Sequence, residues 1–509
     1  MTKRALISVY YKDKIVEFAK GLRELGWELI STGGSYKILK EAGIDVFEVS
    51  EITEFNEILD GRVKTLHPKI HGGILYRRDD DSHVKTMQDL NMGSIDMVVN
   101  NLYPFEQVLN KENATHEELI ENIDIGGPSM IRAAAKNYKD VITVVDYNDY
   151  DEVLNNLKNG GVNNSYRLKL AGKAFNYTAY YDSLISGYFN DINGERFPEK
   201  LTFAYGKESD LRYGENPHQK AAYYKKAGVK SQEIADFKQL HGKELSYNNY
   251  SDINAAVKIV REFQEPCVVG VKHGNPSGIG IGESIDTAFD KAYNCDPVSI
   301  FGGIFAINRE VDEYIAEKIN EFFVEIVIAP GFSKEAFEIL TLKKNIRLIE
   351  MKNIAEYEEK VMSIKETLNG LLYQEADNKL FIDDVKVVTK KLPTEEEMKE
   401  LVFAWKACKN ISSNGVVITK NFGTIGIGVG EVRRSWAVEE AIQRCEGNVQ
   451  GAVMASDAFF FKDTVEMLAK AGIKAVIQPG GSIKDPEVIQ ACDDNGIAMV
   501  FTGIRHFRH

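Results

Sequence analysis

The 509-residue sequence predicts an α/β protein built from two consecutive domains. Short apolar runs typical of buried strands alternate with helical periodicity over the first sixty residues, and the same alternation returns in 267–307 and 416–502. A cluster of turn formers, Asn193-Gly-Glu-Arg-Phe-Pro198, ends a long helical stretch. We therefore predict two domains, 1–197 and 198–509.

The N-terminal region predicts a parallel sheet with helices on both faces, because its strands and helices follow one another in strict alternation. Apolar residues recur at helical spacing from Ile15 to Leu25, and Gly26 ends that helix. From about 148 to 191 the pattern is helical. The expected elements are strand 5–9, helix 15–25, strand 27–30, helix 36–41, and strands 45–49, 97–100 and 141–145.

The C-terminal region contains two βα-rich portions of similar style, which indicates duplicated α/β halves. Strand-like residues 201–205 open the region. Between the halves, the charged, glycine-poor stretch 356–400 fits either a helical connector or a surface excursion. The last portion predicts strand 451–454, helix 464–470, strand 475–477, helix 486–492 and strand 498–501.

Composition narrows the class of function. The formal net charge is −14, so binding to nucleic acid is not expected without a strong basic patch, although a pocket for one small anion is compatible with it. Five cysteines without a C-x-x-C pair argue against a disulfide framework or clustered zinc. The N-terminus lacks a signal-peptide pattern, and nothing approaches ~18 consecutive apolar residues. We expect a cytoplasmic protein that does not bind a membrane.

Three segments of the N-terminal region are typical of anion binding. Ser31-Thr-Gly-Gly-Ser35 joins a strand to a helix, where glycines and free amides favour a phosphate, although an ordinary turn explains it equally well. The basic segment Arg62 to Gly73 favours phosphate binding more strongly. Asp124-Ile-Gly-Gly-Pro-Ser129 precedes a helix with Arg132 and Lys136 on one face, which a capped surface helix also explains.

The sharpest feature of the C-terminal region is Lys272-His273, which a buried strand delivers into a Gly/Asn/Pro loop. Histidine titrates near neutrality, and an adjacent ammonium can stabilise oxyanion charge. Tyr103 likewise follows an apolar strand, where parallel sheets place ligands, although a single tyrosine there is more often structural. The glycines at 426, 428 and 430 suggest a dinucleotide site, but Glu431 breaks the G-x-G-x-x-G pattern.

Taken together, these segments are similar to one family along nearly the whole chain. The sequence resembles the bifunctional purine enzymes that carry 5-aminoimidazole-4-carboxamide ribonucleotide (AICAR) formyltransferase and inosine monophosphate (IMP) cyclohydrolase. The matching motifs are Arg62-Val-Lys-Thr-Leu-His-Pro, Asn101-Leu-Tyr-Pro-Phe, Asp124-Ile-Gly-Gly, Arg132-Ala-Ala-Ala-Lys-Asn137, Leu211-Arg-Tyr-Gly, Asn216-Pro-His-Gln, Val271-Lys-His, Ser456-Asp-Ala-Phe-Phe and Arg505-His-Phe-Arg-His509.

The resemblance implies a methylglyoxal-synthase-like N-terminal domain and a C-terminal domain of two cytidine-deaminase-like halves without the deaminase zinc signature. In the transformylase site, His273 accepts a proton from the AICAR 5-amino group as that amine attacks the formyl carbon of 10-formyltetrahydrofolate, and Lys272 stabilises the tetrahedral intermediate. The substrate-binding residues implied are Arg212 and Arg505 for the phosphate, Tyr213, Gly331, Asn414 and Arg434 for the pocket, and Asn249 and Asp457 at the folate side.

The resemblance also implies a cyclohydrolase site in the N-terminal domain, where the carboxamide nitrogen of formyl-AICAR attacks the formyl carbon and water leaves. Orientation alone can supply several kcal/mol of such a ring closure. The implied catalytic residues are Lys64, Tyr103, Asp124 and Lys136. The implied substrate ligands are Ser31, Gly33, Gly34, Ser35, Arg62, Lys64, Thr65 and Asn101.

Some positions depart from the family pattern. Tyr10-Tyr-Lys-Asp-Lys14 replaces an expected Ser/Tyr-Asp-Lys-Thr-Gly stretch, so the sequence leaves open whether this loop binds a phosphate. Gly274 and Ser277 stand where relatives often have Ala and Cys, and an acidic purine-pocket residue has no clear match near 350–352. Two alternatives stay open: an N-terminal domain that senses nucleotides without catalysis, and an NAD-dependent oxidoreductase.

The expected partners are AICAR, formyl-AICAR or IMP, and a folate. By the resemblance the protein is a homodimer with the transformylase site at the subunit interface. We expect no metal and no nicotinamide cofactor, with 10-formyltetrahydrofolate serving as a co-substrate.

Overall fold

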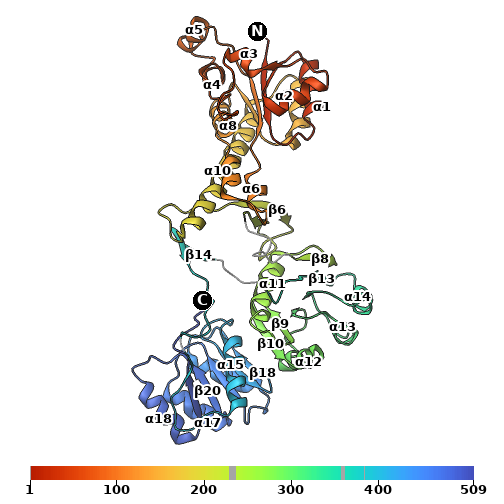
Figure 1. Cartoon of the computed structure of the whole chain (residues 1–509). Helices are drawn as coiled ribbons and strands as arrows, with labels where there is room; N and C mark the ends of the chain where they lie inside the picture. Colours follow the sequence, from red (N-terminus) through yellow and green to blue (C-terminus); the bar gives the residue numbers. More distant parts are fainter. Residues whose placement is uncertain (1, 229–236, 357–361, 383) are drawn as a thin grey trace. The chain divides into compact units, whose positions relative to one another are not determined.

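A computed structural model describes residues 2–228, 237–356, 362–382 and 384–509 (Figure 1). The chain forms two compact units. Unit 1 comprises residues 1–207 and 224–230, and unit 2 comprises residues 208–223 and 231–509. No helix in these described ranges is both long and apolar enough to cross a membrane.

Unit 1 is built on a five-stranded parallel sheet in the order β3-β2-β1-β4-β5. All but β3 are nearly fully buried, as expected for a parallel sheet covered on both faces. The strands are β1 (Arg4–Val9), β2 (Glu28–Ser31), β3 (Phe47–Glu48), β4 (Met97–Asn101) and β5 (Ile142–Val144).

Helices cover both faces of this sheet, so the predicted doubly wound arrangement is present. On one face Phe18 stacks on Tyr150 at 4.2 Å, and on the other Ile70, Ile74 and Met130 pack against the sheet. The helices are α1 (Ile15–Glu24), α2 (Gly33–Glu41), α3 (Val49–Thr53), α4 (Pro68–Leu75), α5 (Asp81–Asp89), α6 (Phe105–Leu109), α7 (His116–Glu121), α8 (Gly126–Lys136), α9 (Tyr150–Lys158), which a 3₁₀ turn (Tyr147–Asp149) precedes, and α10 (Asn164–Asn193).

Unit 2 is built on a twelve-stranded mixed sheet in the order β16-β21-β20-β19-β17-β18-β10-β9-β11-β12-β13-β8. One residue pair, Gly280 with Gly423, joins its two halves. The strands are β8 (Lys238–His241), β9 (Cys267–Lys272), β10 (Asn275–Ile281), β11 (Ile304–Ile307), β12 (Ile326–Ala329), β13 (Arg347–Glu350), β16 (Lys386–Val387), β17 (Val416–Lys420), β18 (Gly423–Gly428), β19 (Val453–Ser456), β20 (Ala475–Gln478) and β21 (Ala498–Phe501).

The two halves repeat one order of elements, so the predicted duplication is present. Each half runs helix, two antiparallel strands, then three helix–strand pairs. The leading helices α11 and α15 share one core cluster, and the remaining helices form a separate core for each half. The helices are α11 (Tyr247–Val260), α12 (Ile285–Cys295), α13 (Glu313–Asn320), α14 (Lys334–Thr341), α15 (Glu395–Cys408), α16 (Arg434–Arg444), α17 (Lys462–Ala471) and α18 (Asp485–Asn495).

Matched glycines hold the helix that follows the two antiparallel strands of each half, α12 or α16, close to the second of those strands. A Cβ on Gly278 or Gly280 would lie 1.9 or 2.3 Å from a carbonyl oxygen of α12. A Cβ on Gly426 or Gly428 would lie 2.1 or 2.0 Å from a carbonyl oxygen of α16. These glycines therefore serve helix packing, which removes the sequence feature that suggested a dinucleotide site.

The structure corrects two expected strands and decides between two alternatives for the stretch 356–400. The expected strand 45–49 is reduced to β3, because α3 begins at Val49 with a capping box. The described part of 356–400 is no helical connector. It contains an exposed hairpin of β14 (Ser363–Thr367) and β15 (Gly370–Gln374), then β16 and the start of α15. The remaining strands, β6 (Tyr205–Leu211) and β7 (Ala221–Lys226), pair with each other, and β6 replaces the strand expected at 201–205.

Candidate functional site

In unit 1, two lysines flank the N-terminus of α2. Gly33 and Gly34 open this helix, and its N-cap Thr32 makes no side-chain cap. The Lys64 Nζ lies 3.6 Å from the place where a Cβ on Gly33 would sit, and the Lys12 Nζ lies 4.0 Å from that place on Gly34. A helix N-terminus with two adjacent ammonium groups is a phosphate site by its chemistry.

Lys12 belongs to this cluster, so the 10–14 loop, whose role the sequence left open, lies at the start of α2. Its Nζ donates to the carbonyl of Val9 and, at 3.2 Å, to Ser35 Oγ. Burial lowers the pKa of Lys12, and the charge of Lys64 lowers it further. An anion between the two ammonium groups would offset both effects.

Asn101 acts on this loop. Its Oδ1 accepts the backbone N–H groups of Tyr10 and Tyr11 at 2.6 and 2.9 Å, and its Nδ2 donates to the Tyr11 carbonyl at 3.1 Å. The side chain is buried and these three bonds occupy it. Asn101 therefore fixes the loop that presents Lys12.

Asp124 lies beside Lys64 just before α8. Its Oδ1 accepts the Gly127 N–H at 2.7 Å. Burial raises the pKa of Asp124, while the amides of Gly127 and Tyr103 and the charge of Lys64 oppose that rise. Burial and the charge of Asp124 also raise the pKa of Tyr103. These groups form a proton-handling set next to the phosphate cluster.

Thr65 reaches the start of α8 as well. Its Oγ1 lies 2.9 Å from the position of a Cβ on Gly126. The segment Lys64-Thr65 thus bridges the N-termini of α2 and α8.

The side chains of three other predicted residues make contacts outside this cluster or lie far from it. Ser31 Oγ is buried and donates to the Ile7 carbonyl at 2.7 Å. Arg62 forms an exposed ion pair with Glu121. Lys136 ends α8, and because a helix rises about 1.5 Å per residue, it lies about 15 Å along the axis from Gly126.

In unit 2, Lys272 and His273 lie at the end of β9, in the turn before β10. The Lys272 Nζ donates to the Phe301 carbonyl at 2.7 Å. His273 is exposed and has a left-handed backbone, with φ 55°. The pair is accessible to a ligand on the side of the large sheet where β9 ends.

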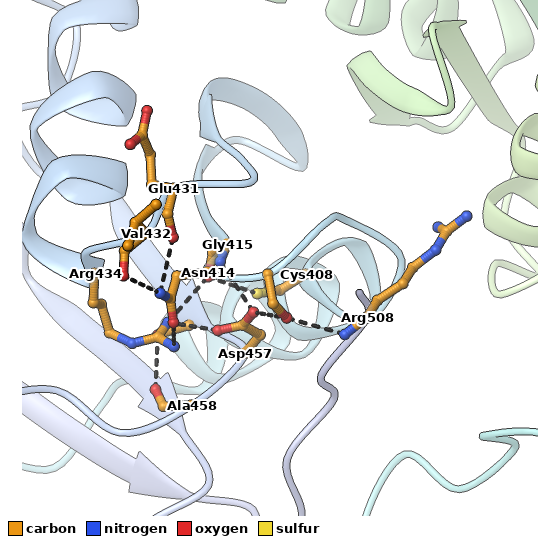
Figure 2. A network of polar contacts seen from close by, with 11 residues as sticks. Cys408, Asn414, Gly415, Glu431, Val432, Arg434, Asp457, Ala458 and Arg508 are labelled. Carbon is orange, nitrogen blue, oxygen red and sulfur yellow. Dashed lines mark hydrogen bonds and ion pairs between the residues drawn. The ribbon is translucent and has the colours of Figure 1, made fainter. Parts of the chain in front are cut away.

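On the same side of the sheet, Arg434 and Asp457 form a buried ion pair, and Figure 2 shows their side chains directed at each other. Arg434 also donates to Asn414 Oδ1 at 2.6 Å. Asp457 accepts from Ser413 Oγ at 2.6 Å and from the Gly415 N–H at 3.0 Å. The predicted Asn414, Arg434 and Asp457 therefore form one network.

Hydrogen bonds connect this network to the turn that carries His273 and to the C-terminus. The Ser412 N–H donates to Asn275 Oδ1 at 3.1 Å, two residues beyond His273. The His506 N–H donates to the Asp457 carbonyl at 3.2 Å, which places neighbouring Arg505 beside the network. The guanidinium of Arg505 lies 4.7 Å from the Phe507 ring centre.

Arg212, Tyr213 and Asn249 lie near the start of β13. Asn249 Nδ2 donates to Glu325 Oε2 at 2.8 Å, and Arg347 pairs with the same oxygen at 3.6 Å. Burial lowers the pKa of Arg347, opposed by Glu325 and Tyr213. The Arg212 guanidinium lies 5.6 Å from the centre of the Tyr213 ring.

Gly331 lies on the opposite side of the sheet, where β9 begins. It follows β12, and both β11 and β12 run opposite to β9. The end of β12 is therefore remote from the end of β9 that carries Lys272 and His273. Within one chain, the structure does not bring Gly331 to the predicted pocket.

Comparison with known proteins assigns the family. Residues 134–444 match the model of the AICARFT/IMPCHase bienzyme, and residues 14–129 match the MGS-like domain. Relatives named bifunctional purine biosynthesis protein PurH cover 100% of this chain and 100% of their own length. They are 56% identical in Thermoanaerobacter sp. (strain X514), 53% in Caldicellulosiruptor saccharolyticus and 52% in Oceanobacillus iheyensis. The chain belongs to the AICARFT/IMPCHase bienzyme family.

A solved structure titled crystal structure of ForH is 36% identical over 37% of this chain and 100% of its own, with a TM-score of 0.34. In the described parts of this bienzyme, no group of three or more His, Cys, Asp or Glu could hold a metal ion. A cavity of about 780 Å³ in unit 2 lies on the side of the sheet opposite the His273 turn, between α15 and the end of β10. Its walls contain none of the predicted site residues.

Proposed function

We propose that this member of the bienzyme family catalyses the last two steps of IMP synthesis. The first is formyl transfer from 10-formyltetrahydrofolate to the 5-amino group of AICAR. The second is dehydrative closure of formyl-AICAR to IMP. The full-length relatives support both activities, and the observation that carries the residue assignment is the presence of one cationic cluster with a proton-handling group in each unit.

For formyl transfer, His273 accepts the proton that the AICAR amine loses as its nitrogen bonds to the formyl carbon. Lys272 stabilises the oxyanion of the tetrahedral intermediate. This intermediate collapses as the bond from the formyl carbon to N10 breaks and N10 takes up the proton that His273 had accepted, so that neutral tetrahydrofolate leaves. Arg212 and Arg505 hold the AICAR phosphate. The buried network of Asn414, Arg434 and Asp457 makes this side of the sheet rigid. A rigid site is needed to orient a weakly nucleophilic aryl amine for attack.

For ring closure, the phosphate of formyl-AICAR binds at the start of α2 between Lys12 and Lys64. Asp124, whose pKa burial raises, accepts the carboxamide proton, and Tyr103 or Lys64 protonates the leaving hydroxyl. Lys136 remains a predicted catalytic residue. Its place at the far end of α8 makes it the assignment that most needs a mutational test.

We further propose that the protein is a cytoplasmic homodimer whose transformylase site takes residues from both subunits. Gly331 and His273 occupy opposite sides of one sheet, so a pocket that uses both draws them from different chains. The β14–β15 hairpin is exposed and carries Ile364, Leu368, Leu371 and Leu372 on its surface. A second copy of the chain would cover such apolar residues.

The decisive experiment mixes the purified protein with AICAR and 10-formyltetrahydrofolate and follows AICAR loss and IMP formation separately. We expect both, with His273→Ala abolishing formyl transfer but not the cyclisation of supplied formyl-AICAR. Lys64→Ala should do the reverse. If folate-dependent loss of AICAR is absent in the wild type, the proposal fails. If formyl-AICAR accumulates without IMP, unit 1 is a nucleotide-binding module without catalysis.

A further inference from the structure

A carboxylate from a neighbouring helix holds the turn that carries His273. His273 and Gly274 form a two-residue hairpin turn, both left-handed, with φ 55° and 76°. Asp252 of α11 accepts both of their backbone N–H groups, through Oδ2 from His273 at 3.3 Å and through Oδ1 from Gly274 at 2.7 Å. One side chain thus fixes both central residues of the turn.

The second half of unit 2 contains the same device at the corresponding positions. Asn421 and Phe422 form the turn between β17 and β18, with φ 54° and 59°. Glu400 Oε2 accepts the Phe422 N–H at 2.7 Å. Both acids are the sixth residue of a 14-residue helix, α11 for Asp252 and α15 for Glu400. The duplication therefore conserves the acid and changes the side chain on the turn.

We propose that Asp252 is a positioning residue for formyl transfer, acting through the backbone of the His273 turn. This inference rests on the proposed role of His273. A left-handed conformation is unfavourable for a non-glycine residue, so contacts with the surroundings help to maintain it. By accepting two adjacent amides, the Asp252 carboxylate helps to hold the His273 turn in this conformation.

The contact between the carboxylate and the turn matters more in the first half than in the second, because only the first turn carries an imidazole that must be positioned for the reaction. A proton acceptor must lie within hydrogen-bond reach of the reacting amine, and misplacement by 1 Å can cost roughly 10²-fold in rate. In the second half the same positions carry Asn421 and Phe422, neither of which accepts a proton at neutral pH. Glu400 therefore maintains a turn, whereas Asp252 maintains a turn that carries the proposed base.

The test compares Asp252→Asn with the matched control Glu400→Gln in the full-length protein. An asparagine oxygen accepts one amide but its NH₂ group cannot accept the second. We expect Asp252→Asn to lower kcat for formyl transfer roughly 10- to 100-fold while the KM for AICAR changes less than about threefold, because the phosphate ligands are untouched. The cyclisation rate in the same sample should stay unchanged and serves as an internal measure of folded enzyme.

Glu400→Gln should leave formyl transfer within about twofold of the wild type, because glutamine still accepts the one amide. The proposal is overturned if Asp252→Asn keeps wild-type kcat, or if the two variants lose formyl transfer equally and in proportion to a fall in apparent Tm. If His273→Ala itself keeps wild-type transfer, the proposed function of the turn fails instead, and the two failures are distinguishable.

Discussion

Lys12 offers a sharp test of the cyclohydrolase pocket, because its removal should weaken binding without weakening the fold. Its ammonium is partly buried at the start of α2, and burial together with Lys64 lowers its pKa. A base with a lowered pKa in the folded state stabilises the fold above its unfolded pKa, and this contribution is lost as pH falls through the folded value. At neutral pH the charged Lys12 therefore costs stability until a phosphate arrives.

The expected magnitude follows from the contact that is lost. A hydrogen bond to a charged group contributes roughly 1.5–3 kcal/mol, so Lys12→Met should weaken IMP binding by about 2 kcal/mol, or roughly 30-fold. The Val9 carbonyl keeps a donor, because Ser35 Oγ also bonds to it at 2.9 Å. The apparent Tm of the unliganded variant should therefore not fall.

Isothermal titration calorimetry with IMP at fixed ionic strength measures the affinity. The matched control is Lys14→Met, because Lys14 is 53% exposed and pairs with Asp151 at 3.5 Å. We expect Lys14→Met to bind IMP like the wild type. Lys12→Met with unchanged affinity, or with a clear loss of thermal stability, would refute the reasoning.

Three further outcomes follow from the structure. Burial raises the pKa of Asp124 above its ordinary 3.8, so the cyclisation rate should fall as pH drops through that raised value, and Asp124→Asn should remove this dependence. The raised pKa favours the neutral acid in the fold, so its contribution to stability is full below pH 3.8 and is lost as pH rises through the raised value. Arg434→Met leaves the fully buried Asp457 without its cation, so unit 2 should lose about 3–5 kcal/mol and formyl transfer should disappear while cyclisation persists. Gly428→Ala puts a Cβ 2.0 Å from the Ala437 carbonyl and should lower the apparent Tm of unit 2 by roughly 5–10 °C, whereas Gly172→Ala in α10, with nothing within 4 Å, should not.

Much of the fold could be predicted because periodicity and turn residues agree along the chain. The strand before Tyr10 and the strand that ends at Asn101 are mostly apolar, and both are largely buried in unit 1. The last two helix–strand pairs of unit 2, and the strand β19 before them, were expected within a few residues of their bounds. By contrast, β3 is shorter than the expected strand 45–49. A capping box at Glu48 starts α3 at Val49, the last residue of that expected strand.

Tertiary proximity accounts for what the sequence did not show. Lys12 lies in a loop that departs from the family pattern, and only the three hydrogen bonds of Asn101 reveal where that loop is held. Asn101 was itself expected to bind substrate, but its bonds are internal. The signal that could have found Lys12 was its proximity in sequence to the end of β1, because parallel strands deliver their following loops to one edge.

The Gly-x-Gly pairs show a second limit of prediction from sequence. Near Gly278 and Gly426 the spacing resembled part of a nucleotide motif, yet a missing side chain equally permits two backbones to approach. Spacing alone does not distinguish a ligand from a helix as the neighbour. The structure identifies the neighbour as a helix, because carbonyl oxygens of α12 and α16 lie where a Cβ on these glycines would be.

The outermost strands of both large sheets are unusually short. β3 and β5 have two and three residues, and β16 and β8 have two and four. A short outermost strand has few free backbone amides and carbonyls with which a strand of another molecule could pair. In the described part of the chain, the two large sheets thereby present little template for edge-to-edge assembly with other molecules.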